Sequence, residues 1–593
     1  MLSVREWRER MQNLMWVFLA MTLGILAVAL NGEMREKMMK LPGMAGAEET
    51  AQKVSRFVLE HEAVCVLLLV CAAILVRAWA FIALPQGQNQ DGTMAAVEAY
   101  CLMRDGVDHD GHPWPTYFEA WGGTQMSTLY SYIMIPFIRV FGLTKLALRL
   151  PMLLCSLLAI LAGWDLARRA CGKGYGMLLL LTVAVNPWHI LQSRWALEAN
   201  LMPHVLIVAC WLLFLGRSRR WALYLSMAVF GLAPYAYGVA TFVTPVLLIP
   251  MAVWLVSAKR IRLRQALLCV LIFTAVAGPY FLTLAIQAFE WETMTIGPFS
   301  LPRFYDTMRA NDISLFAPNP YERMISCFGA FLRQFLINSY GASYNEVSWA
   351  HTMYPFTAPL YLSGLYLWWR KSRKDSSRKN IAADAVDSGD LFRLIGFWLL
   401  GAAVNGLMIP GVINRQNAVY YPLMFMTAYS VYAAGKRLKL AGSALIIMLL
   451  VSFAGLCGSY FGDRAYQDRV ARSFHEGLQE ALTETKDWDY DHYYVFDQDK
   501  IALTQLMFAH RIDYTLLSEE KDLPGRDGQP SGWYFNDRYI IIKDEDKENL
   551  ELNPMDCAVY VFPKEESVRF NPEEYEITVF GNYCAAYPRY WIY

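Results

Sequence analysis

The chain has 593 residues, of which 55% are hydrophobic and 18% are charged, and its mean hydropathy is positive. This composition argues against a water-soluble globular class and predicts a polytopic α-helical membrane protein. Lys plus Arg and Asp plus Glu both total 53, so the formal net charge is zero. The chain therefore lacks the positive net charge that would favour a nucleic-acid partner. The expected partner is the lipid bilayer, and the placement of the charges has to supply the topology.

Apolar stretches long enough to span a bilayer recur up to about residue 460, and about eleven or twelve are expected. Residues 14 to 30 are expected to form an accessory helix and not a signal peptide, because they lack a cleavage site of the signal-peptide type. The orientation of this helix is left open, because the basic residues before it would lie on the external side. An uninterrupted span is expected over 62 to 84. The later spans are expected near 148–167, 174–191, 200–216, 221–237, 239–257, 265–286, 354–369, 391–410, 417–434 and 440–460.

Basic clusters occupy every second connection between these spans. By the positive-inside rule these connections are cytoplasmic, and the others are external. The basic clusters lie at 168–173, 217–220, 259–264, 370–379 and 436–439. The connections expected outside are 85–147, 192–200, 287–353, 410–417 and everything after 461.

The apolar segment 127–141 is ambiguous by hydropathy alone. If it crossed the membrane, every later basic cluster would face outward. It is also short and amphipathic and contains Pro136, so we expect an external helix that lies on the membrane surface.

From about residue 462 onward the composition changes to that of a soluble domain. Strand-like runs at 493–496, 539–542, 558–562 and 575–580 alternate with polar turns, which predicts a small external α/β domain. Cys557 and Cys584 lie in this region, and an extracytoplasmic location would permit them to pair. The expected division of the chain is an accessory helix and linker (1–61), a transmembrane catalytic domain (62–461) and the soluble domain (462–593).

Asp91 follows the expected span 62–84 at the point where hydrocarbon gives way to water. A carboxylate placed there can remain ionised and still reach chemistry on a lipid headgroup. The nearby acids Asp105, Asp108 and Asp110 are expected to be ordinary solvated turn residues.

Two further external segments carry isolated charges. Arg194 and Glu198 are four residues apart, so they share a face of a helical turn and could either pair or serve a function at the membrane surface. Arg415 is a lone external cation, and its guanidinium suits a phosphate, the alternative being an interfacial anchor.

Together these pieces resemble the GT-C glycosyltransferases of the protein O-mannosyltransferase and aminoarabinose-transferase type, which use polyprenyl-phosphate-linked sugars. The resemblance covers about residues 62 to 435. It rests on Gln90-Asp91, Trp121-Gly122-Gly123-Thr124-Gln125, Arg149-Leu150-Pro151, Ser193-Arg194 with Glu198, and Asn414-Arg415-Gln416-Asn417 before Tyr421-Pro422.

The resemblance implies a GT-C fold and a role for each matching residue. Asp91 would be the general base, Glu198 would be a second catalytic acid, and Arg194 and Arg415 would bind the donor phosphate. Glu119, Trp121 and Gln125 would contact substrate.

One position departs from the family, which commonly has Asp-Glu where this chain has Asp91-Gly92, and this leaves the role of a second acid open. No cofactor is predicted firmly. A divalent metal is left open, since Glu119 resembles an acid that some relatives use with a late-loop His, for which His351 is the candidate here.

The expected function is inverting transfer of a sugar from a polyprenyl-phosphate donor to an acceptor hydroxyl at the external face of the plasma membrane. The acceptor could be a protein, a wall polymer or a glycolipid. The alternative is a transporter or flippase of lipid-linked glycans, which predicts ionisable residues within spans and interrupted helices in two related halves. A non-catalytic scaffold is a further alternative, and it would leave Asp91 replaceable.

Overall fold

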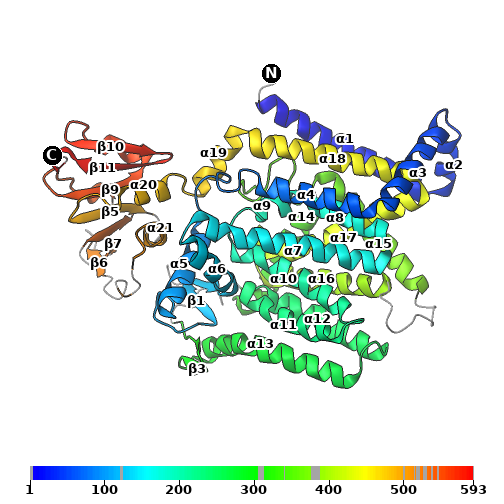
Figure 1. The fold of residues 1–593 in the computed structure, drawn as a ribbon, viewed down its shortest axis with the longest axis horizontal. Helices are drawn as coiled ribbons and strands as arrows, with labels where there is room; N and C mark the ends of the chain where they lie inside the picture. Colours follow the sequence, from blue (N-terminus) through cyan, green and yellow to red (C-terminus); the bar gives the residue numbers. More distant parts are fainter. Residues whose placement is uncertain are drawn as a thin grey trace.

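A bundle of long helices makes up most of the molecule, and a sheet-containing unit lies at one end of it (Figure 1). The computed structural model describes residues 4–120, 124–304, 313–339, 341–375, 388–497, 501–512, 515, 521–524, 530–535, 538–543 and 547–591.

Within these residues, 7 helices are long and apolar enough to cross a membrane. They are α1 (Val4–Leu30), α7 (Lys145–Cys171), α10 (Glu198–Leu215), α12 (Ala240–Ser257), α13 (Leu263–Phe289), α16 (Ser388–Met408) and α18 (Lys439–Gly462). A bent pair, α3 (Met44–Glu60) and α4 (Glu62–Ala78), could form an eighth span. The chain is therefore a multi-pass membrane protein, as its composition predicts.

Other helices coincide with predicted spans but do not meet the same length and hydropathy criterion. They are α8 (Lys173–Ala184), α11 (Arg220–Ala236), α15 (Ala358–Asp375) and α17 (Tyr420–Arg437). The total of eleven or twelve spans stays a prediction.

The expected single span over 62–84 is wrong in one respect, because its helix ends early. Helix α4 stops at Ala78, and Trp79 is already extended with a ψ of 126°. The carbonyl groups at this end are bonded by a buried arginine, Arg194, and not by a continuing helix. Asp91 therefore lies in the first turn of a separate helix, α5 (Gln90–Asp105).

The ambiguous segment 127–141 forms a 13-residue helix, α6 (Leu129–Phe141). At 1.5 Å per residue it is about 20 Å long, which is too short to cross a hydrocarbon core of about 30 Å. A short hairpin, β1 (Tyr117–Ala120) and β2 (Thr124–Ser127), precedes it. The length fits the predicted surface helix, and its position on the membrane surface stays a prediction.

The expected external loop 287–353 contains regular structure that the sequence did not reveal. A hairpin of β3 (Met294–Ile296) and β4 (Phe299–Leu301) comes first, and the helix α14 (Pro320–Ile337) follows. Polar and charged residues interrupt the apolar residues of α14, so it lacks the signal of a spanning helix.

The C-terminal unit contains helices α19 (Arg464–Ser473), α20 (Leu478–Thr485) and α21 (Ile501–His510) and a seven-stranded sheet. The strand order is β10-β11-β9-β5-β8-β7-β6, with β5 parallel to β8 and β9 and the other pairs antiparallel. The strands are β5 (His492–Asp497), β6 (Lys521–Pro524), β7 (Pro530–Phe535), β8 (Tyr539–Lys543), β9 (Ala558–Pro563), β10 (Tyr575–Phe580) and β11 (Tyr583–Pro588).

All four predicted strand runs are confirmed in this sheet, as β5, β8, β9 and β10. The pairing that was left open for Cys557 and Cys584 is not formed, because both are free thiols. Cys584 lies in β11 opposite Phe562 of β9, whereas the Cys557 sulfur contacts the backbone oxygen of Asp489. The domain boundary at 462 stays a prediction.

The C-terminal unit packs on the coil that leads into α5. The backbone N–H of Gln88 donates to the carbonyl of Phe474 at 2.6 Å. The side-chain amide of Gln505, on α21, donates to the carbonyl of Gln88 and to the hydroxyl of Thr93, both at 3.2 Å. This unit therefore helps to fix the segment that carries Asp91.

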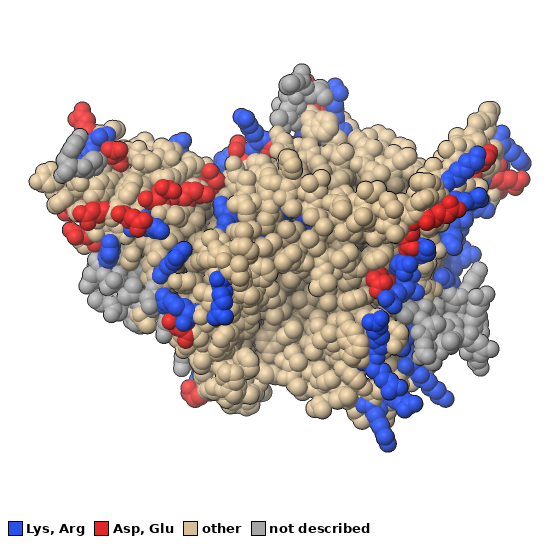
Figure 2. Space-filling model, viewed as in Figure 1, with Lys and Arg blue, Asp and Glu red and all other residues tan. Residues whose placement is uncertain are grey.

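Figure 2 shows Lys and Arg side chains gathered at the right-hand end of the bundle, away from the sheet unit. Two of the predicted basic loops, 217–220 and 259–264, meet with Asp390 around one cavity of about 260 Å³. The basic residues that line it are Arg217, Arg220, Lys259, Arg260 and Arg262. Because α10 runs from Glu198 to Leu215, these loops and Glu198 lie at opposite ends of the bundle. The assignment of one end to the cytoplasm stays a prediction.

Candidate functional site

A polar cavity of about 120 Å³ lies where the first turn of α5, the start of α10 and the turn before α17 meet. The two carboxylates that were predicted to be catalytic, Asp91 and Glu198, both line it. The other lining residues are Gln90, Met94, Ala120, Met126, Leu197, Ala199, Tyr237 and Asn414. We call this space the carboxylate cavity.

Asp91 is exposed and occupies the first turn of α5. The side chain of Asn89 caps this helix by accepting from the backbone N–H of Gly92 at 3.2 Å. The N-terminal end of a helix favours a negative charge. Burial, and then the charge of Asp91, raise the pKa of the Tyr344 hydroxyl, so the segment before α15 lies close to this carboxylate.

Gly92 has a structural reason for replacing the second acid of the family pattern. A Cβ atom at this position would lie 2.6 Å from the carbonyl oxygen of Ala196 and 2.9 Å from its Cβ. Only a glycine permits α5 to approach the segment before α10 this closely. The same contact brings Asp91 and Glu198 to one cavity.

We expect the substitution Gly92→Ala to destabilise the protein by about 2 kcal/mol, because the added methyl overpacks a backbone contact. It should also lower the rate of any reaction that needs Asp91, since α5 must shift. Thermal unfolding in detergent measures the first effect. Gly24→Ala is the matched control, because nothing lies within 4 Å of its Cβ. Equal melting temperatures for Gly92→Ala and the control would contradict this account.

The side chain of Arg194 does not line either the carboxylate cavity or the cavity beside Arg415. Its side chain is fully buried, and its guanidinium nitrogens donate to backbone carbonyls in the segment 76–84 and to the hydroxyl of Tyr460. The carbonyls belong to Val76, Arg77, Trp79, Ala80 and Leu84, at 2.7 to 3.3 Å. This geometry contradicts the predicted contact with a donor phosphate. Arg194 shapes the end of α4.

Arg149 does the same for the next part of the chain. Its buried guanidinium donates to the carbonyls of Phe81, Ile82, Pro85 and Gly87, at 2.8 to 3.3 Å. A guanidinium has five N–H donors and no acceptor, so it suits a turn that presents several carbonyl oxygens. The two arginines together hold the coil between α4 and α5.

Glu198 begins α10, and its side chain is largely buried. Its carboxylate accepts a hydrogen bond from the backbone N–H of Ser127 at the end of β2. A pairing with Arg194 was left open by the sequence, but the guanidinium of Arg194 bonds to the end of α4 and to Tyr460. Glu198 instead joins β2 to α10 beside Asp91.

The turn that contains Arg415 is fixed by its amide neighbours. The amide of Asn417 donates to the carbonyl of Ala199 and to Asn200 Oδ1, and Gln416 Oε1 accepts from the amide of Asn405. Asn414 Oδ1 accepts from Asn345 at 3.2 Å. These contacts position Arg415 at the edge of a second cavity.

This second cavity has a volume of about 400 Å³ and is lined mainly by aromatic and aliphatic side chains. We call it the apolar cavity. Its polar lining includes Gln125, Gln287 and Arg415, and Tyr237 lines both this cavity and the carboxylate cavity. The other lining residues are Tyr117, Gly238, Val239, Thr241, Phe242, Tyr280, Leu284, Ala288, Ile313, Phe316 and Ile409.

The remaining predicted residues lie at different places. Glu119 on β1 is opposite Gln125 on β2, and Gln125 lines the apolar cavity. Trp121 lies outside the described residues. The Nδ1 of His351 is 2.8 Å from the carbonyl oxygen of Ile337. Neither Glu119 nor His351 belongs to a group of three or more metal-ligating side chains among the residues that the structure describes.

A buried pair of Glu98 and His109 was not predicted. The carboxylate of Glu98 accepts from the His109 ring and from its backbone N–H. Burial acts to lower the pKa of His109, but the adjacent Glu98 carboxylate overcomes this and raises it. Asp108 is also buried, so its expected place in a solvated turn is wrong. Its carboxylate accepts backbone hydrogen bonds and closes the turn around itself.

A buried polar network within the bundle was also missed. Arg77 contacts His189 at 3.0 Å, and the Tyr421 hydroxyl contacts both His189 and His204 at 3.0 Å. Arg77 also donates to backbone carbonyls of α4 and α8, including that of Ala184. Arg77 could have been found, because it is a charged residue inside the predicted span 62–84.

The fold and these cavities define a multi-pass membrane protein with two carboxylates at one end of its bundle. Residues 126–282 match the model of the family described as dolichyl-phosphate-mannose-protein mannosyltransferase. This match confirms the predicted resemblance to GT-C glycosyltransferases. The matched segment includes Arg194 and Glu198, whereas Asp91 and Arg415 lie outside it. A search of curated proteins found no match.

Solved structures of several glycosyltransferases are similar in fold at low identity. ArnT from Cupriavidus metallidurans bound to undecaprenyl phosphate matches with a TM-score of 0.49 and 13% identity, over 88% of this chain and 97% of that chain. The Archaeoglobus fulgidus oligosaccharyltransferase AglB, in complex with an inhibitory peptide and a dolichol-phosphate, matches with a TM-score of 0.45 and 10% identity, over 76% of this chain and 63% of that chain.

Proposed function

We propose that the chain is a membrane glycosyltransferase that moves a sugar from a polyprenyl-phosphate donor to an acceptor hydroxyl at the external face. The observation that carries the proposal is the pair of cavities that share Tyr237. One offers exposed Asp91 beside Glu198, and the other offers an apolar lining with Arg415 at its edge. The family match over residues 126–282 supports the same chemistry.

The two cavities suit the two parts of such a donor. An isoprenoid tail is apolar and would occupy the apolar cavity, with its phosphate beside Arg415. The sugar would then extend past Tyr237 toward the carboxylate cavity. This arrangement would bring the anomeric carbon between Arg415 and Asp91.

The reaction is a single displacement. Asp91 takes the proton from the acceptor hydroxyl, and the acceptor oxygen attacks the anomeric carbon. The bond from that carbon to the phosphate oxygen breaks, and the polyprenyl phosphate leaves with the electron pair. Arg415 stabilises the negative charge of the leaving phosphate, and the configuration of the sugar inverts. Glu198 keeps β2 against α10 and lines the site beside the base.

Purified protein tests the assignment directly with a radiolabelled polyprenyl-phosphate sugar and cell-envelope extract. We expect label to move from the lipid fraction to an envelope acceptor, with release of polyprenyl phosphate. A panel of such donors that gave no transfer with any envelope fraction would contradict the proposal.

Arg415→Gln tests the place of the phosphate. Because hydrogen bonds to charged groups contribute about 1.5–3 kcal/mol, we expect the donor KM to rise roughly tenfold or more. The matched control is Arg139→Gln, an exposed arginine on α6 that does not line the apolar cavity. An unchanged donor KM in Arg415→Gln would show that this cation does not bind the donor.

The transporter alternative rests on the network of Arg77, His189, His204 and Tyr421. Each of these side chains is almost fully buried, and they bond to one another and to backbone carbonyls. Such packing is typical of a structural network within a helix bundle. The exposed carboxylate of Asp91 at the end of the bundle favours the enzyme.

A further inference from the structure

A compact cluster of metal-ligating side chains follows α5, outside both cavities. Asp108, Asp110 and His112 each offer one ligand atom, and these atoms all lie within 4.8 Å of one another. Asp108 Oδ1 accepts from the backbone N–H groups of Asp110 at 3.1 Å and His112 at 2.7 Å. The turn is therefore wrapped around the Asp108 carboxylate, and its other oxygen is left to face the cluster.

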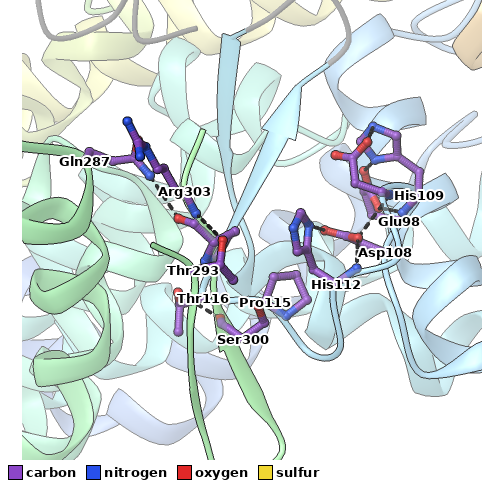
Figure 3. A network of polar contacts seen from close by, with 12 residues as sticks. Glu98, Asp108, His109, His112, Pro115, Thr116, Gln287, Thr293, Ser300 and Arg303 are labelled. Atoms are coloured by element: carbon purple, nitrogen blue, oxygen red, sulfur yellow. Dashed lines mark hydrogen bonds and ion pairs between the residues drawn. The ribbon is translucent and has the colours of Figure 1, made fainter. Parts of the chain in front are cut away.

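That second oxygen is the independent observation that indicates a ligand. The Asp108 side chain is 1% exposed, and its Oδ2 has no hydrogen-bond partner. Burying an unsatisfied polar atom costs free energy, and the cost is larger for a carboxylate than for a neutral group. Oδ2 lies 3.5 Å from His112 Nδ1, which is also buried without a hydrogen bond (Figure 3). These two ligand atoms thus face each other across an ion-pair contact, and neither of them makes a hydrogen bond.

A cation between these atoms would satisfy both. Ligand atoms bound to zinc at about 2.0–2.1 Å lie about 3.0–3.4 Å from each other. This is close to the 3.5 Å between Asp108 Oδ2 and His112 Nδ1. A neutral imidazole presents one nitrogen with a free lone pair, and that nitrogen can bind a metal. The side chains of Asp110 and His112 are 35% and 27% exposed, so a cation can enter and water can complete its coordination.

The surroundings would hold the ligands in place. His109 Nε2 lies 3.3 Å from Asp110 Oδ1, and the other nitrogen of this ring contacts buried Glu98 on α5. The residue after His112 is Pro113, whose carbonyl accepts from the N–H of Ser300 on β4 at 2.9 Å. Groups that orient metal ligands in this way contribute strongly to metal affinity.

We propose that Asp108, Asp110 and His112 bind a divalent cation of the zinc or manganese class, which fixes the turn after α5 to α5 and to the β3–β4 hairpin. Two carboxylates and one imidazole suit these metals. The proposed site is separate from the pair Glu119 and His351, and it stands on geometry that does not depend on the proposed function.

The test is metal binding by the full chain in detergent after treatment with a chelator. Titration with zinc chloride or manganese chloride alone should show one bound equivalent and a rise in melting temperature. His112→Ala and Asp110→Asn should each weaken binding roughly 100-fold. Both are preferred to Asp108→Asn, because Asp108 also accepts backbone hydrogen bonds and its loss could unfold the turn.

Two controls separate this site from others. Asp105→Asn removes an exposed acid at the end of the same helix and should leave binding unchanged. Glu119→Gln should also leave it unchanged, and loss of binding there would assign the metal to the other pair. Absence of binding at roughly 1 mM metal, which is near the weak end of the affinities of specific cation sites, would overturn the proposal. Equal binding by wild type and His112→Ala would also overturn it. In that case a proton shared by Asp108 and His112 would hold the pair together.

Discussion

Asp91→Asn should abolish sugar transfer while the protein remains folded. An asparagine has nearly the same shape, but it cannot accept the proton of the acceptor hydroxyl. General base catalysis contributes roughly 10²–10⁴-fold, so kcat should fall by at least about 100-fold, equivalent to about 2.7 kcal/mol of barrier. The measurement is the initial rate of transfer at saturating donor, together with the affinity for polyprenyl phosphate, which should not change.

Asp105→Asn is the matched control for this substitution. Both residues are exposed acids on α5, but Asp105 is at the opposite end of the helix, next to Arg104, and does not line the carboxylate cavity. Its rate should equal that of the wild type. If Asp91→Asn transferred sugar as fast as this control, Asp91 would not be the base.

Arg194→Met should disorder the end of α4 and should lower the free energy of unfolding by more than about 4 kcal/mol. The substitution keeps much of the apolar side-chain volume but leaves several buried carbonyls without a donor, and each such group costs about 1–3 kcal/mol. Since the same segment leads to Asp91, transfer should be lost together with stability. Unfolding in denaturant and the transfer rate measure the two effects.

A lysine separates the charge of Arg194 from its geometry. Arg194→Lys keeps the positive charge but cannot reach carbonyls spread from Val76 to Leu84. We expect it to be nearly as damaging as the methionine. Arg219→Met, at an exposed arginine in a basic loop, should behave as the wild type. Full stability in Arg194→Lys would indicate that the positive charge stabilises this segment, and not the several N–H donors of the guanidinium.

Much of the helical architecture could be predicted because it follows from hydropathy over long windows. Helix α13, for example, runs from Leu263 to Phe289 and so exceeds the predicted span 265–286 by only a few residues at either end. The end of α4 could not be predicted in this way. It depends on Arg194, which is more than one hundred residues away and supplies hydrogen bonds that no local pattern encodes. Helix α14 was missed for a different reason, because it is amphipathic and not uniformly apolar.

The candidate site was predicted in part. Asp91, Glu198 and Arg415 were chosen as charged residues in segments expected outside, and the structure brings the first two to one cavity and the third to its neighbour. Arg194 was chosen by the same reasoning and lies elsewhere, because a guanidinium satisfies backbone carbonyls as well as a phosphate. Gly92 was read as a missing acid. Its contact with Ala196 shows why the position has no room for one.

The central claim is that the protein transfers the sugar and does not move the lipid-linked sugar intact. Proteoliposomes that contain purified protein, a polyprenyl-phosphate sugar labelled in both the sugar and the lipid, and an envelope acceptor on one side test it directly. We expect the sugar label to appear on the acceptor while an equal amount of labelled polyprenyl phosphate is released. Movement of both labels across the bilayer with the sugar–phosphate bond intact, and no labelled acceptor, would contradict the account.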